Sequence, residues 1–185
     1  ENSFYVPKPN LIPFNSDNNT KIKIIKISCG EAHSMALSDT HKVYCWGFGS
    51  NGQLGLGFCE DSFEPGKGSA QSRRLTPTEI TTFPKTCTIT NIHCGKTFTM
   101  FEDSNGQLFA CGINDLGQLG IDKPHPNDHL FNKEIKCSDF VRPTYLDYFL
   151  RMKVEHIACG EGHCIAVIRD INSDRQNLWA WGSNK

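Results

Sequence analysis

Two histidines stand at a spacing that could build a metal site. His33 and His163 each follow a cysteine by four residues, in the pattern Cys-Gly-x-x-His. Cysteine and histidine are ligands that zinc takes, but a zinc site needs four ligands at the corners of a tetrahedron. The pattern occurs once more with Phe98 at the histidine position, where no ligand is available. We therefore expect His33 and His163 to have a structural role.

A second candidate metal site lies further along the chain. His125 and His129 are four residues apart, as on one face of a helix, and Cys137 follows them. Pro124 and Pro126 make a helix unfavourable here, because proline lacks an amide hydrogen and its ring clashes with the preceding turn. The sequence therefore predicts no metal and no cofactor.

Nucleophilic catalysis would need a cysteine or serine beside a base. Cys164 directly follows His163, but neighbouring side chains on a strand point to opposite faces, so these two residues do not form a pair. The glycines fall at the corners of a repeat instead of between a strand and a helix, where they would cradle phosphate. We expect the chain not to be an enzyme.

Charge and apolar pattern argue against two classes of partner. The chain of 185 residues carries 19 Lys and Arg against 20 Asp and Glu, so its formal net charge is −1. A balance so close to neutral gives no long-range field to hold nucleic acid. The longest aliphatic run, Ile165–Ile168, is far shorter than the roughly 20 residues that span a bilayer. We expect protein partners, with no membrane and no nucleic acid.

The chain has nine cysteines, and their pattern bears on its cellular compartment. Their number is odd, no Cys-x-x-Cys occurs and several recur at matching places, so reduced thiols in the cytoplasm or nucleus fit better than a secreted disulfide framework. The chain opens at Glu1 without a methionine or an apolar leader and closes at Lys185 within a repeat. We expect it to be part of a longer protein.

The chain contains three copies of one pattern, which is the strongest feature of the sequence. Gly30, Gly95 and Gly160 follow one another at a constant spacing of 65 residues. Each copy runs from Cys-Gly through an apolar stretch to a second glycine, and the first two copies continue into Gly-Gln-Leu-Gly. The recurring positions are Gly30, His33, Trp46, Gly47, Gln53 and Leu54 in the first copy, Gly95, Gly112, Gln118 and Leu119 in the second, and Gly160, His163, Trp181 and Gly182 in the third.

Within each copy, apolar and polar residues alternate with a period of two, which indicates half-buried antiparallel strands. Asn105-Gly106, between two such runs, predicts a type I′ hairpin turn with positive φ at both residues. The third copy is longer by five residues, and we place this surplus in an exposed turn around 172–176. Lysine alternates with isoleucine over 21–27, which predicts a strand with lysine outward and isoleucine inward rather than a nucleic-acid site.

Short antiparallel sheets that repeat at this interval, with glycines at their corners, are typical of the blades of a β-propeller. The predicted fold class is all-β: a propeller of about three blades, present as an open arc or a fragment. Leu54 and Leu119 are expected at matching places between blades. Because an arc leaves its end faces uncovered, further blades or another chain would be needed to close it.

At Cys-Gly-x-x-His, Trp-Gly and Gly-Gln-Leu-Gly the sequence resembles the regulator of chromosome condensation repeat family. The resemblance covers the chain from about Pro9 onward and implies a seven-bladed propeller, of which this chain supplies about three units. Two functions are implied as well: the founding member promotes guanine-nucleotide exchange on the small GTPase Ran, and other relatives are scaffolds attached to kinase or ubiquitin-ligase domains. Phe98 and Cys111 depart from the pattern, at the places of its histidine and its tryptophan.

A proline followed three residues later by isoleucine or leucine precedes each copy, at Pro9, Pro77 and Pro143. With these prolines as starting points, we divide the chain into an N-terminal extension and three four-stranded units separated by two inserts, the last unit being truncated. The divisions are 1–8 for the extension, 9–57, 77–121 and 143–185 for the propeller units, and 58–76 and 122–142 for the inserts.

Loops as long as these inserts are usually binding elements or disordered. The first insert has charges among glycine and serine and is typical of a solvated linker, although Arg73 and Arg74 remain candidates for partner binding. The second carries apolar residues that a solvated loop does not need, and Phe131 and Phe140 could anchor a partner. The sequence predicts a protein-interaction scaffold, with guanine-nucleotide exchange on a Ran-like GTPase as the alternative.

Overall fold

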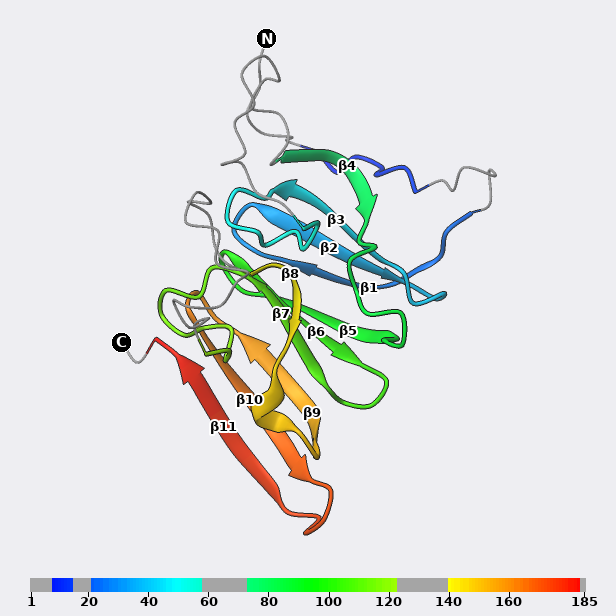
Figure 1. The fold of residues 1–185 in the computed structure, drawn as a ribbon. Coiled ribbons are helices and arrows are strands. Elements are labelled where there is room, and N and C mark those ends of the chain that lie inside the picture. Colours follow the sequence, from blue (N-terminus) through cyan, green and yellow to red (C-terminus); the bar gives the residue numbers. More distant parts are fainter. Residues whose placement is uncertain (1–7, 15–20, 58–72, 123–139, 184–185) are drawn as a thin grey trace.

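The fold is described from a computed structural model that places residues 8–14, 21–57, 73–122 and 140–183 (Figure 1). These residues form three antiparallel sheets that follow one another along the chain, with one short 3₁₀ turn, η1 (Asp147–Phe149). Within these ranges, no helix has the length and apolar character needed to cross a membrane.

Each sheet is a meander in which consecutive strands are hydrogen-bonded neighbours. The first sheet has the order β1-β2-β3-β4, the second β5-β6-β7-β8 and the third β9-β10-β11, and all pairs are antiparallel. The strands are β1 (Ile24–Cys29), β2 (His33–Ser38), β3 (Val43–Phe48), β4 (Arg73–Glu79), β5 (Ile89–Cys94), β6 (Phe98–Asp103), β7 (Leu108–Gly112), β8 (Phe140–Tyr145), β9 (Met152–Cys159), β10 (His163–Asp170) and β11 (Gln176–Gly182).

The outermost strand of each four-stranded sheet comes from residues just before the next repeat. β4 contains Pro77 and pairs with β3, and β8 contains Pro143 and pairs with β7, so sheets and sequence units are offset along the chain. The two ranges predicted as inserts end inside these strands, while 58–72 and 123–139 lie outside the described residues. The third sheet has three described strands where four were expected.

The three sheets lie face to face in chain order (Figure 1). Their first strands are neighbours, because β1 contacts β5 and β5 contacts β9, whereas β4 and β8 are the outermost strands of their sheets. Sheets that follow one another in this way, with their first strands on a common inner side, are the blades of a propeller. The predicted all-β propeller arc is confirmed.

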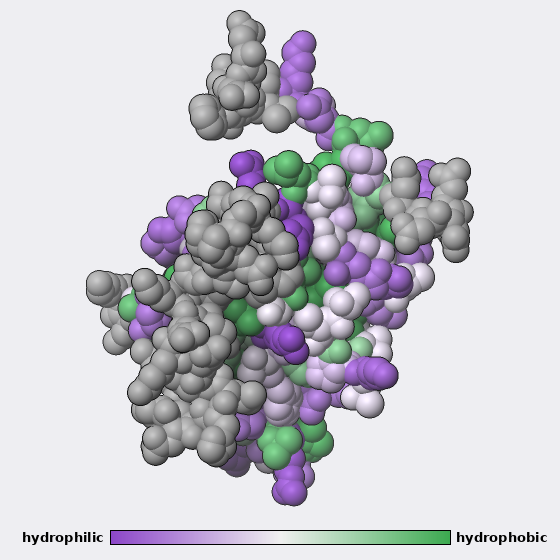
Figure 2. Space-filling view, turned by 45° about the horizontal axis from the view of Figure 1, so that its top comes forward, coloured by the Kyte–Doolittle hydropathy of each residue, from purple (hydrophilic) through white to green (hydrophobic). Residues whose placement is uncertain are grey.

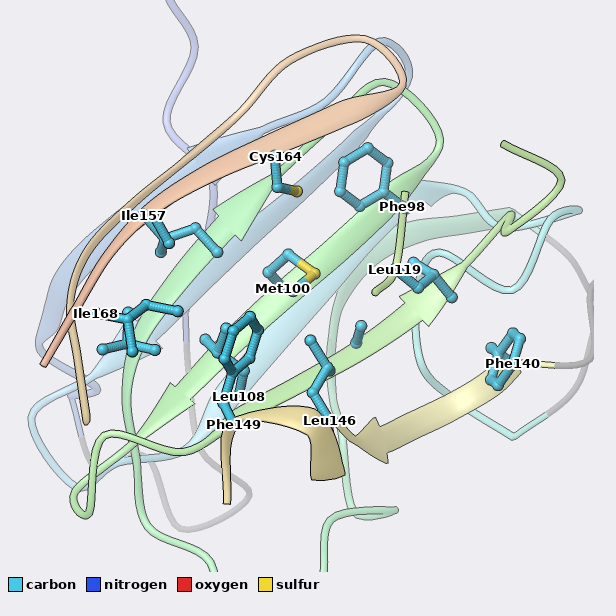
Figure 3. Close-up of a cluster of buried hydrophobic side chains, with 13 residues drawn as sticks. Phe98, Met100, Leu108, Leu119, Phe140, Leu146, Phe149, Ile157, Cys164 and Ile168 are labelled. Atoms are coloured by element: carbon cyan, nitrogen blue, oxygen red, sulfur yellow. The ribbon is translucent and has the colours of Figure 1, made fainter. Parts of the chain in front are cut away.

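Two hydrophobic cores hold the blades together, one at each junction. The first core joins sheets one and two and includes Leu54, and the second joins sheets two and three and includes Leu119. Both leucines are buried at matching places, as predicted. Figure 3 shows the second core, where Phe98 and Met100 of β6 pack with side chains of the third sheet such as Ile157. Complete burial of one such side chain stabilises the fold by roughly 1.5–3 kcal/mol.

The glycine at the Trp-Gly position of the pattern, which follows Cys111 in the second sheet, is required by a close approach of two backbone segments. Gly47, Gly112 and Gly182 have φ values of 98°, 115° and 96°, which side-chain-bearing residues rarely adopt. A Cβ on any of them would lie 2.5 or 2.6 Å from a carbonyl oxygen of the tight turn that precedes the second strand. The amide of the following residue donates a hydrogen bond to that same oxygen in all three sheets.

The glycine of Cys-Gly is required by an aromatic ring three residues later. A Cβ at this position would overlap the ring, so the glycine and the ring form one packing unit. The three units are Gly30 with His33, Gly95 with Phe98 and Gly160 with His163. Phe98 therefore keeps the packing of the pattern although it replaces the histidine.

The first strand, β1, differs from its prediction. It begins at Ile24, shifts register against β2 just after this residue, and exposes both Ile25 and Ile27. The expectation that isoleucine points inward was wrong for two reasons. Two consecutive isoleucines break the alternation, and no described sheet packs against the face that carries Ile27. Ile27 is 75% exposed, whereas Ile92 and Ile157 at the same place in the other sheets are 4% and 9% exposed.

The turn between β6 and β7 is not of the predicted type I′. Gly106 has a positive φ of 74°, but Asn105 does not adopt one. Backbone bonds from Asp103 N–H to the Gln107 carbonyl and from Gly106 N–H to the Asp103 carbonyl close a three-residue loop, a common hairpin alternative with glycine in the left-handed position. The Asp103 carboxylate favours this loop, because it accepts the amide hydrogens of Asn105 and Gln107.

Candidate interaction surfaces

The tight turns between the first and second strands form a row at one end of the three sheets. We call the turns at Glu31, Lys96 and Glu161 the turn row. Lys96 Nζ lies 2.6 Å from the Glu161 carboxylate and 4.0 Å from that of Glu31, and the Glu31 amide donates a hydrogen bond to the Lys96 carbonyl. The hydrogen bond between the side chains of Lys96 and Glu161 raises the pKa of the lysine and lowers that of the glutamate. The row therefore presents fixed charges of alternating sign.

A hollow of about 290 Å³ lies at the turn row, lined by its charged residues and by the three Cys-Gly pairs. Within the described ranges, no three His, Cys, Asp or Glu side chains are grouped so as to hold a metal ion. The predicted candidates His125, His129 and Cys137 lie outside the described residues. The chemistry that the hollow offers is thus hydrogen bonding and charge, suited to a polar partner surface.

His33 is buried at the first junction and links two blades. Its Nε2 lies 3.0 Å from Thr99 Oγ1, and the Thr99 hydroxyl donates its hydrogen to the Gln53 carbonyl. Because that hydrogen is already used, His33 Nε2 carries the ring hydrogen and donates it to Thr99. Among the described residues His33 Nδ1 has no partner, and burial lowers the pKa of His33 to about 4. The ring is therefore neutral, and its role in the described chain is structural.

The glutamine of Gly-Gln-Leu-Gly connects each blade to the next. The side-chain oxygens of Gln53 and Gln118 accept hydrogen bonds from the backbone amide two residues earlier, which fixes the connecting loop. Their backbone carbonyls accept hydrogen bonds from the following blade: Cys111 Sγ donates to Gln53 at 3.5 Å, and Trp181 Nε1 donates to Gln118 at 3.0 Å. Cys111 thus replaces the tryptophan of the pattern with another donor at the same place.

The residues predicted to bind a partner are separated by the fold. Arg73 and Arg74 lie on β4, the first exposed and the second half-buried. Phe140 lies opposite Gly112 in the ladder of β7 and β8 and is 6% exposed, inside the second core (Figure 3). Within the described chain this ring is therefore packed in the core, and anchoring of a partner by Phe140 stays a prediction. Phe131 lies outside the described residues.

His163 and Cys164 face opposite sides of β10, as strand alternation requires. His163 is exposed, whereas Cys164 is fully buried. The Cys164 sulfur lies 3.5 Å from the sulfur of Cys159, its partner on β9, and the hydrogen bond between the two thiols raises the pKa of Cys164. A buried, protonated thiol is a poor nucleophile, so this arrangement provides no nucleophile and base pair.

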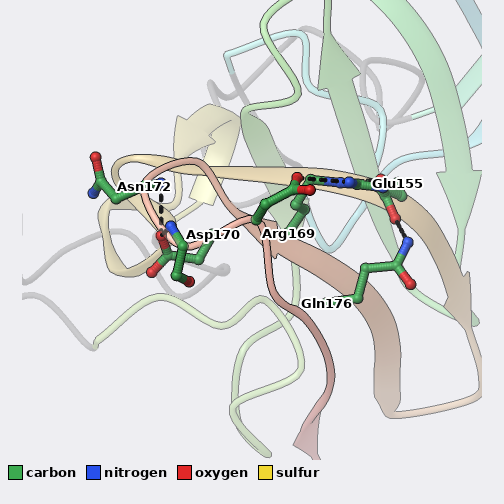
Figure 4. A network of polar contacts seen from close by, with 7 residues as sticks. Glu155, Arg169, Asp170, Asn172 and Gln176 are labelled. Atoms are coloured by element: carbon green, nitrogen blue, oxygen red, sulfur yellow. Dashed lines mark hydrogen bonds and ion pairs between the residues drawn. The ribbon is translucent and has the colours of Figure 1, made fainter.

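The third hairpin is longer mainly because its strands are longer. β10 runs to Asp170 and β11 starts at Gln176, so part of the surplus predicted as an exposed turn is strand. Arg169 fixes the tip: its Nε lies 2.6 Å from Glu155 Oε1 and its Nη1 lies 2.7 Å from Asp174 (Figure 4). Gln176 donates to Glu155 from the other strand. The hairpin is therefore a firm projection.

The end faces of the arc expose apolar side chains. Leu178 on β11 is 73% exposed and Ile165 on β10 is 44% exposed, and Ile27 is exposed on the opposite end of the arc. Met35 and Met100, which stand at the place of Ile165 in the first two sheets, are completely buried. On the side seen in Figure 2, apolar groups are dispersed among polar ones and form no single patch.

Sequence reasoning missed an aromatic cluster beside β11. Tyr148 and Phe149 of η1 pack edge to face on Trp179, with ring centroids 5.7 and 5.6 Å apart. The indole nitrogen of Trp179 is buried, with no hydrogen-bond partner within the described ranges. A signal for this cluster is present in the sequence, because an aromatic residue stands two positions before the tryptophan of Trp-Gly at both Tyr44 and Trp179.

Family models provide the comparison that identifies the repeat. Models of the regulator of chromosome condensation (RCC1) repeat match residues 24–53, 40–101 and 105–167. These ranges cover most of the three sheets. The chain belongs to the regulator of chromosome condensation (RCC1) repeat family.

Relatives with RCC1 repeats are much longer than this chain. It is 29% identical over 163 residues to the serine/threonine-protein kinase Nek9 of Xenopus laevis, which covers 86% of the chain and 15% of the kinase. It is 29% identical over 164 residues to the ultraviolet-B receptor UVR8 of Arabidopsis thaliana, covering 88% of the chain and 30% of the receptor. The crystal structure of yeast RCC1 (Prp20) bound to Kap60 matches with a TM-score of 0.65 and 25% identity, over 86% of this chain and 32% of that chain.

Proposed function

We propose that the chain is a protein-interaction segment of a propeller scaffold. The observation that carries this proposal is the turn row. Its three turns share one geometry, since each is closed by a hydrogen bond of 2.8 or 2.9 Å from the glycine amide to the carbonyl three residues later. The exposed side chains on this constant backbone are glutamate, lysine and glutamate. Repeat proteins recognise partners through such variable positions on a fixed framework.

The relatives support this proposal through their diversity. One is named a kinase and another a photoreceptor, and each carries the similar segment within a much longer chain. A segment that recurs in proteins with unlike names is a framework that can host different functions, which favours a binding role over one shared reaction.

The test compares protein capture by three forms of the chain. The turn-row variant combines Lys96→Glu with Glu161→Lys, which keeps the net charge and an ion pair between these two positions but makes the contact of residue 96 with Glu31 repulsive. The matched control combines Lys23→Glu with Asp39→Lys, two exposed residues at the other end of the first sheet. We expect a defined set of proteins, captured by wild type and control, to fall at least tenfold with the turn-row variant, as measured by quantitative mass spectrometry. Equal capture by all three forms would contradict the proposal.

Guanine-nucleotide exchange on a Ran-like GTPase is the second candidate, and the likeness to yeast RCC1 favours it. Exchange needs a continuous face that displaces Mg²⁺ and nucleotide, and we assign no residue of this chain to that role. The deciding measurement is stopped-flow release of fluorescent GDP from Ran. We expect no acceleration at substoichiometric amounts of the protein, and catalytic acceleration would replace the scaffold proposal with an exchange factor.

The second insert is proposed to add to partner binding through Phe131. Because 140–142 belong to β8, a deletion that leaves the fold intact must stop at residue 139. Replacement of 123–139 by a short glycine-serine linker is expected to weaken partner capture without changing the melting temperature. Capture that is unchanged by this replacement would exclude the insert from the binding surface.

The proposed compartment is the cytoplasm or nucleus. The described cysteines are free, and Cys159 and Cys164 remain unbonded although their sulfurs lie 3.5 Å apart. Free thiols at such short range are compatible with a reducing environment. Mass spectrometry of the protein alkylated directly in cell lysate tests this, since an oxidised Cys159–Cys164 pair would contradict it.

A further inference from the structure

Cys159 and Cys164 are a pair of thiols on neighbouring strands. They lie directly opposite each other in the ladder of β9 and β10, and their sulfurs are 3.5 Å apart. The next pair toward the turn, Gly160 and His163, is joined by a hydrogen bond of 2.8 Å from the glycine amide to the histidine carbonyl. Because hydrogen-bonded and non-hydrogen-bonded pairs alternate along an antiparallel ladder, the cysteines are a non-hydrogen-bonded pair, in which side chains lie closer together.

The backbone at this pair suits a disulfide. The Cα atoms of a non-hydrogen-bonded pair are about 4.5 Å apart, which falls within the range of about 4.4–6.8 Å across disulfides. A disulfide bond is about 2.0 Å long, so the two sulfurs must approach each other by about 1.5 Å. Because the Cα separation is already suitable, rotation of the two side chains supplies this movement.

The other two sheets have a hydroxyl group at the place of Cys164. In the first sheet, Cys29 Sγ lies 3.8 Å from Ser34 Oγ, and in the second the Cys94 side chain is hydrogen-bonded to that of Thr99. Neither of these pairs can form a disulfide. The third sheet, alone among the described sheets, therefore has two thiols at these opposing positions.

The Gln118 carbonyl keeps a hydrogen-bond partner when this pair is oxidised. Cys164 Sγ donates to it at 3.6 Å, and a disulfide removes that donor. Trp181 Nε1 donates to the same oxygen at 3.0 Å and stays in place. The Cys164 side chain points into the second core (Figure 3), where an uncharged disulfide fits the apolar surroundings. The core therefore accepts the oxidised form.

Cys159 is accessible to a small reagent, whereas Cys164 is not. Cys159 is half-buried and lines the hollow at the turn row, and Cys164 is fully buried. Cys94, at the same place as Cys159 in the middle sheet, is half-buried although sheets pack on both faces of that sheet. A further neighbour beside the third sheet would therefore leave Cys159 accessible as well.

We propose that Cys159 and Cys164 are a reversible redox pair that closes to a disulfide when a small disulfide such as glutathione disulfide accumulates. The Cys159 thiolate attacks one sulfur of glutathione disulfide and releases one glutathione, which leaves a mixed disulfide on Cys159. Cys164 then attacks the Cys159 sulfur and releases the second glutathione. The two thiols lose two protons and two electrons, and glutathione disulfide takes up both to become two glutathione molecules.

The second step is the slow one. The hydrogen bond to Cys159 and burial raise the pKa of Cys164, so little of it is present as the reactive thiolate. Closure should therefore take minutes to hours, as uncatalysed disulfide exchange does. Excess reduced glutathione runs both steps backwards, so the pair stays open in the reducing compartment proposed above. This chemistry needs no partner protein and does not rest on the proposed scaffold function.

The first test incubates the purified protein in glutathione buffers of increasing oxidised fraction and then alkylates the free thiols. Cleavage after Glu161 separates the two cysteines, so mass spectrometry detects their disulfide as a linked pair of peptides. We expect the link between Cys159 and Cys164 to increase with the oxidised fraction and to disappear after dithiothreitol. A link from Cys159 to Cys94 instead, or no link in any buffer, would overturn the proposal.

The second test uses Cys164→Thr, which introduces the residue that stands at this place in the second sheet. We expect at least tenfold more glutathione bound to Cys159 in this variant than in wild type, because no thiol displaces it. Cys87→Ser is the control, since Cys87 packs against the first core, away from the pair, and this variant should behave as wild type. Equal amounts of glutathione on Cys159 in Cys164→Thr and wild type would overturn the proposal.

The third test measures what the disulfide does to the turn that carries Glu161. The Gly160 amide directly follows Cys159, and its hydrogen bond to His163 closes this turn. We expect it to exchange hydrogen several-fold more slowly in the oxidised protein, while the Gly95 amide of the second sheet is unchanged. An effect of this restraint on a partner at the turn row rests on the proposed function, but the exchange rate does not. Unchanged exchange at Gly160 in the oxidised protein would overturn the restraint.

Discussion

His33 and Phe98 occupy the same place in successive blades and fill it with different chemistry. Each ring covers the glycine of Cys-Gly, so the packing is the same in both. The histidine adds a hydrogen bond to Thr99 across the junction, but its Nδ1 is buried with no partner in the described part of the chain. Such a histidine stabilises the fold only while it is neutral.

Acid should weaken the first junction through His33. Its pKa is about 4 in the folded chain, below the ordinary 6.5, so the unfolded state binds more protons between these values. Stability is therefore full above pH 6.5 and falls as pH drops toward 4, by up to roughly 3 kcal/mol for this group. Urea unfolding at pH 7 and pH 4.5 should show the loss, and His33→Phe, which introduces the ring that Phe98 places in the next blade, should reduce it.

His93 limits how much of this loss one substitution can remove. Burial, with a smaller effect of Lys26, lowers the pKa of His93 to about 4 as well, so His33→Phe should leave part of the pH dependence. His156→Gln, at an exposed position on β9, is the control and should keep the full wild-type loss. A His33→Phe variant with the same pH dependence as wild type would contradict the assignment.

At the scale of the elements, each blade is closed where the strand end meets the turn row. In each sheet the glycine at the Trp-Gly position lies against a carbonyl oxygen of the turn row, and the amide of the next residue donates a hydrogen bond to that oxygen. The end of the third strand is thereby held at the start of the second strand. This contact recurs in all three sheets although the turn side chains differ. The backbone of the turn row is therefore constant from blade to blade, and its side chains are variable.

Gly112→Ala and Gly117→Ala should differ sharply in cost. Both glycines have positive φ, which costs a residue with a side chain roughly 1–2 kcal/mol. At Gly112 the new methyl group would also lie 2.6 Å from the Thr97 carbonyl, whereas at Gly117 it meets nothing within 4 Å. We expect Gly112→Ala to lower the free energy of unfolding by about 3 kcal/mol or more and Gly117→Ala by about 1 kcal/mol. Equal losses of unfolding free energy in urea titrations would show that the close approach of Gly112 to the Thr97 carbonyl does not affect stability.

At the scale of the whole molecule, the middle blade of the described chain is supported on both faces and its outer blades on one. Every residue of β7 is buried, whereas β11 has no buried residue. Local stability follows the density of packing around each strand, so the arc should be most stable at its centre.

Hydrogen exchange should follow this order in the chain. Backbone amides of β6 and β7 should exchange slowest, and the hydrogen-bonded amides of β11 faster by on the order of 100-fold. Exchange in β11 as slow as in β7 would contradict a stability maximum at the centre.

The sequence by itself predicted the three-fold pattern, the all-β class and the matching places of Leu54 and Leu119. These features depend on spacing along the chain, because a period of two defines a strand face and a constant register of 65 residues gives each blade the same positions. The sequence predicted the geometry of the turn between β6 and β7 incorrectly. Asn105-Gly106 predicted a type I′ turn, but the Asp103 carboxylate accepts the amide hydrogens of Asn105 and Gln107 and favours a three-residue loop instead.

Only the tertiary structure decided which surfaces are covered. Ile27 and Ile92 are the same residue at the same place in the pattern, yet one is 75% exposed and the other 4%, because a described sheet packs against the second and none of the described sheets packs against the first. Phe140 was predicted on a binding loop, but pairing of β8 with β7 turns it into the core. Burial depends on the neighbouring blade, and the local sequence of a residue does not specify that neighbour.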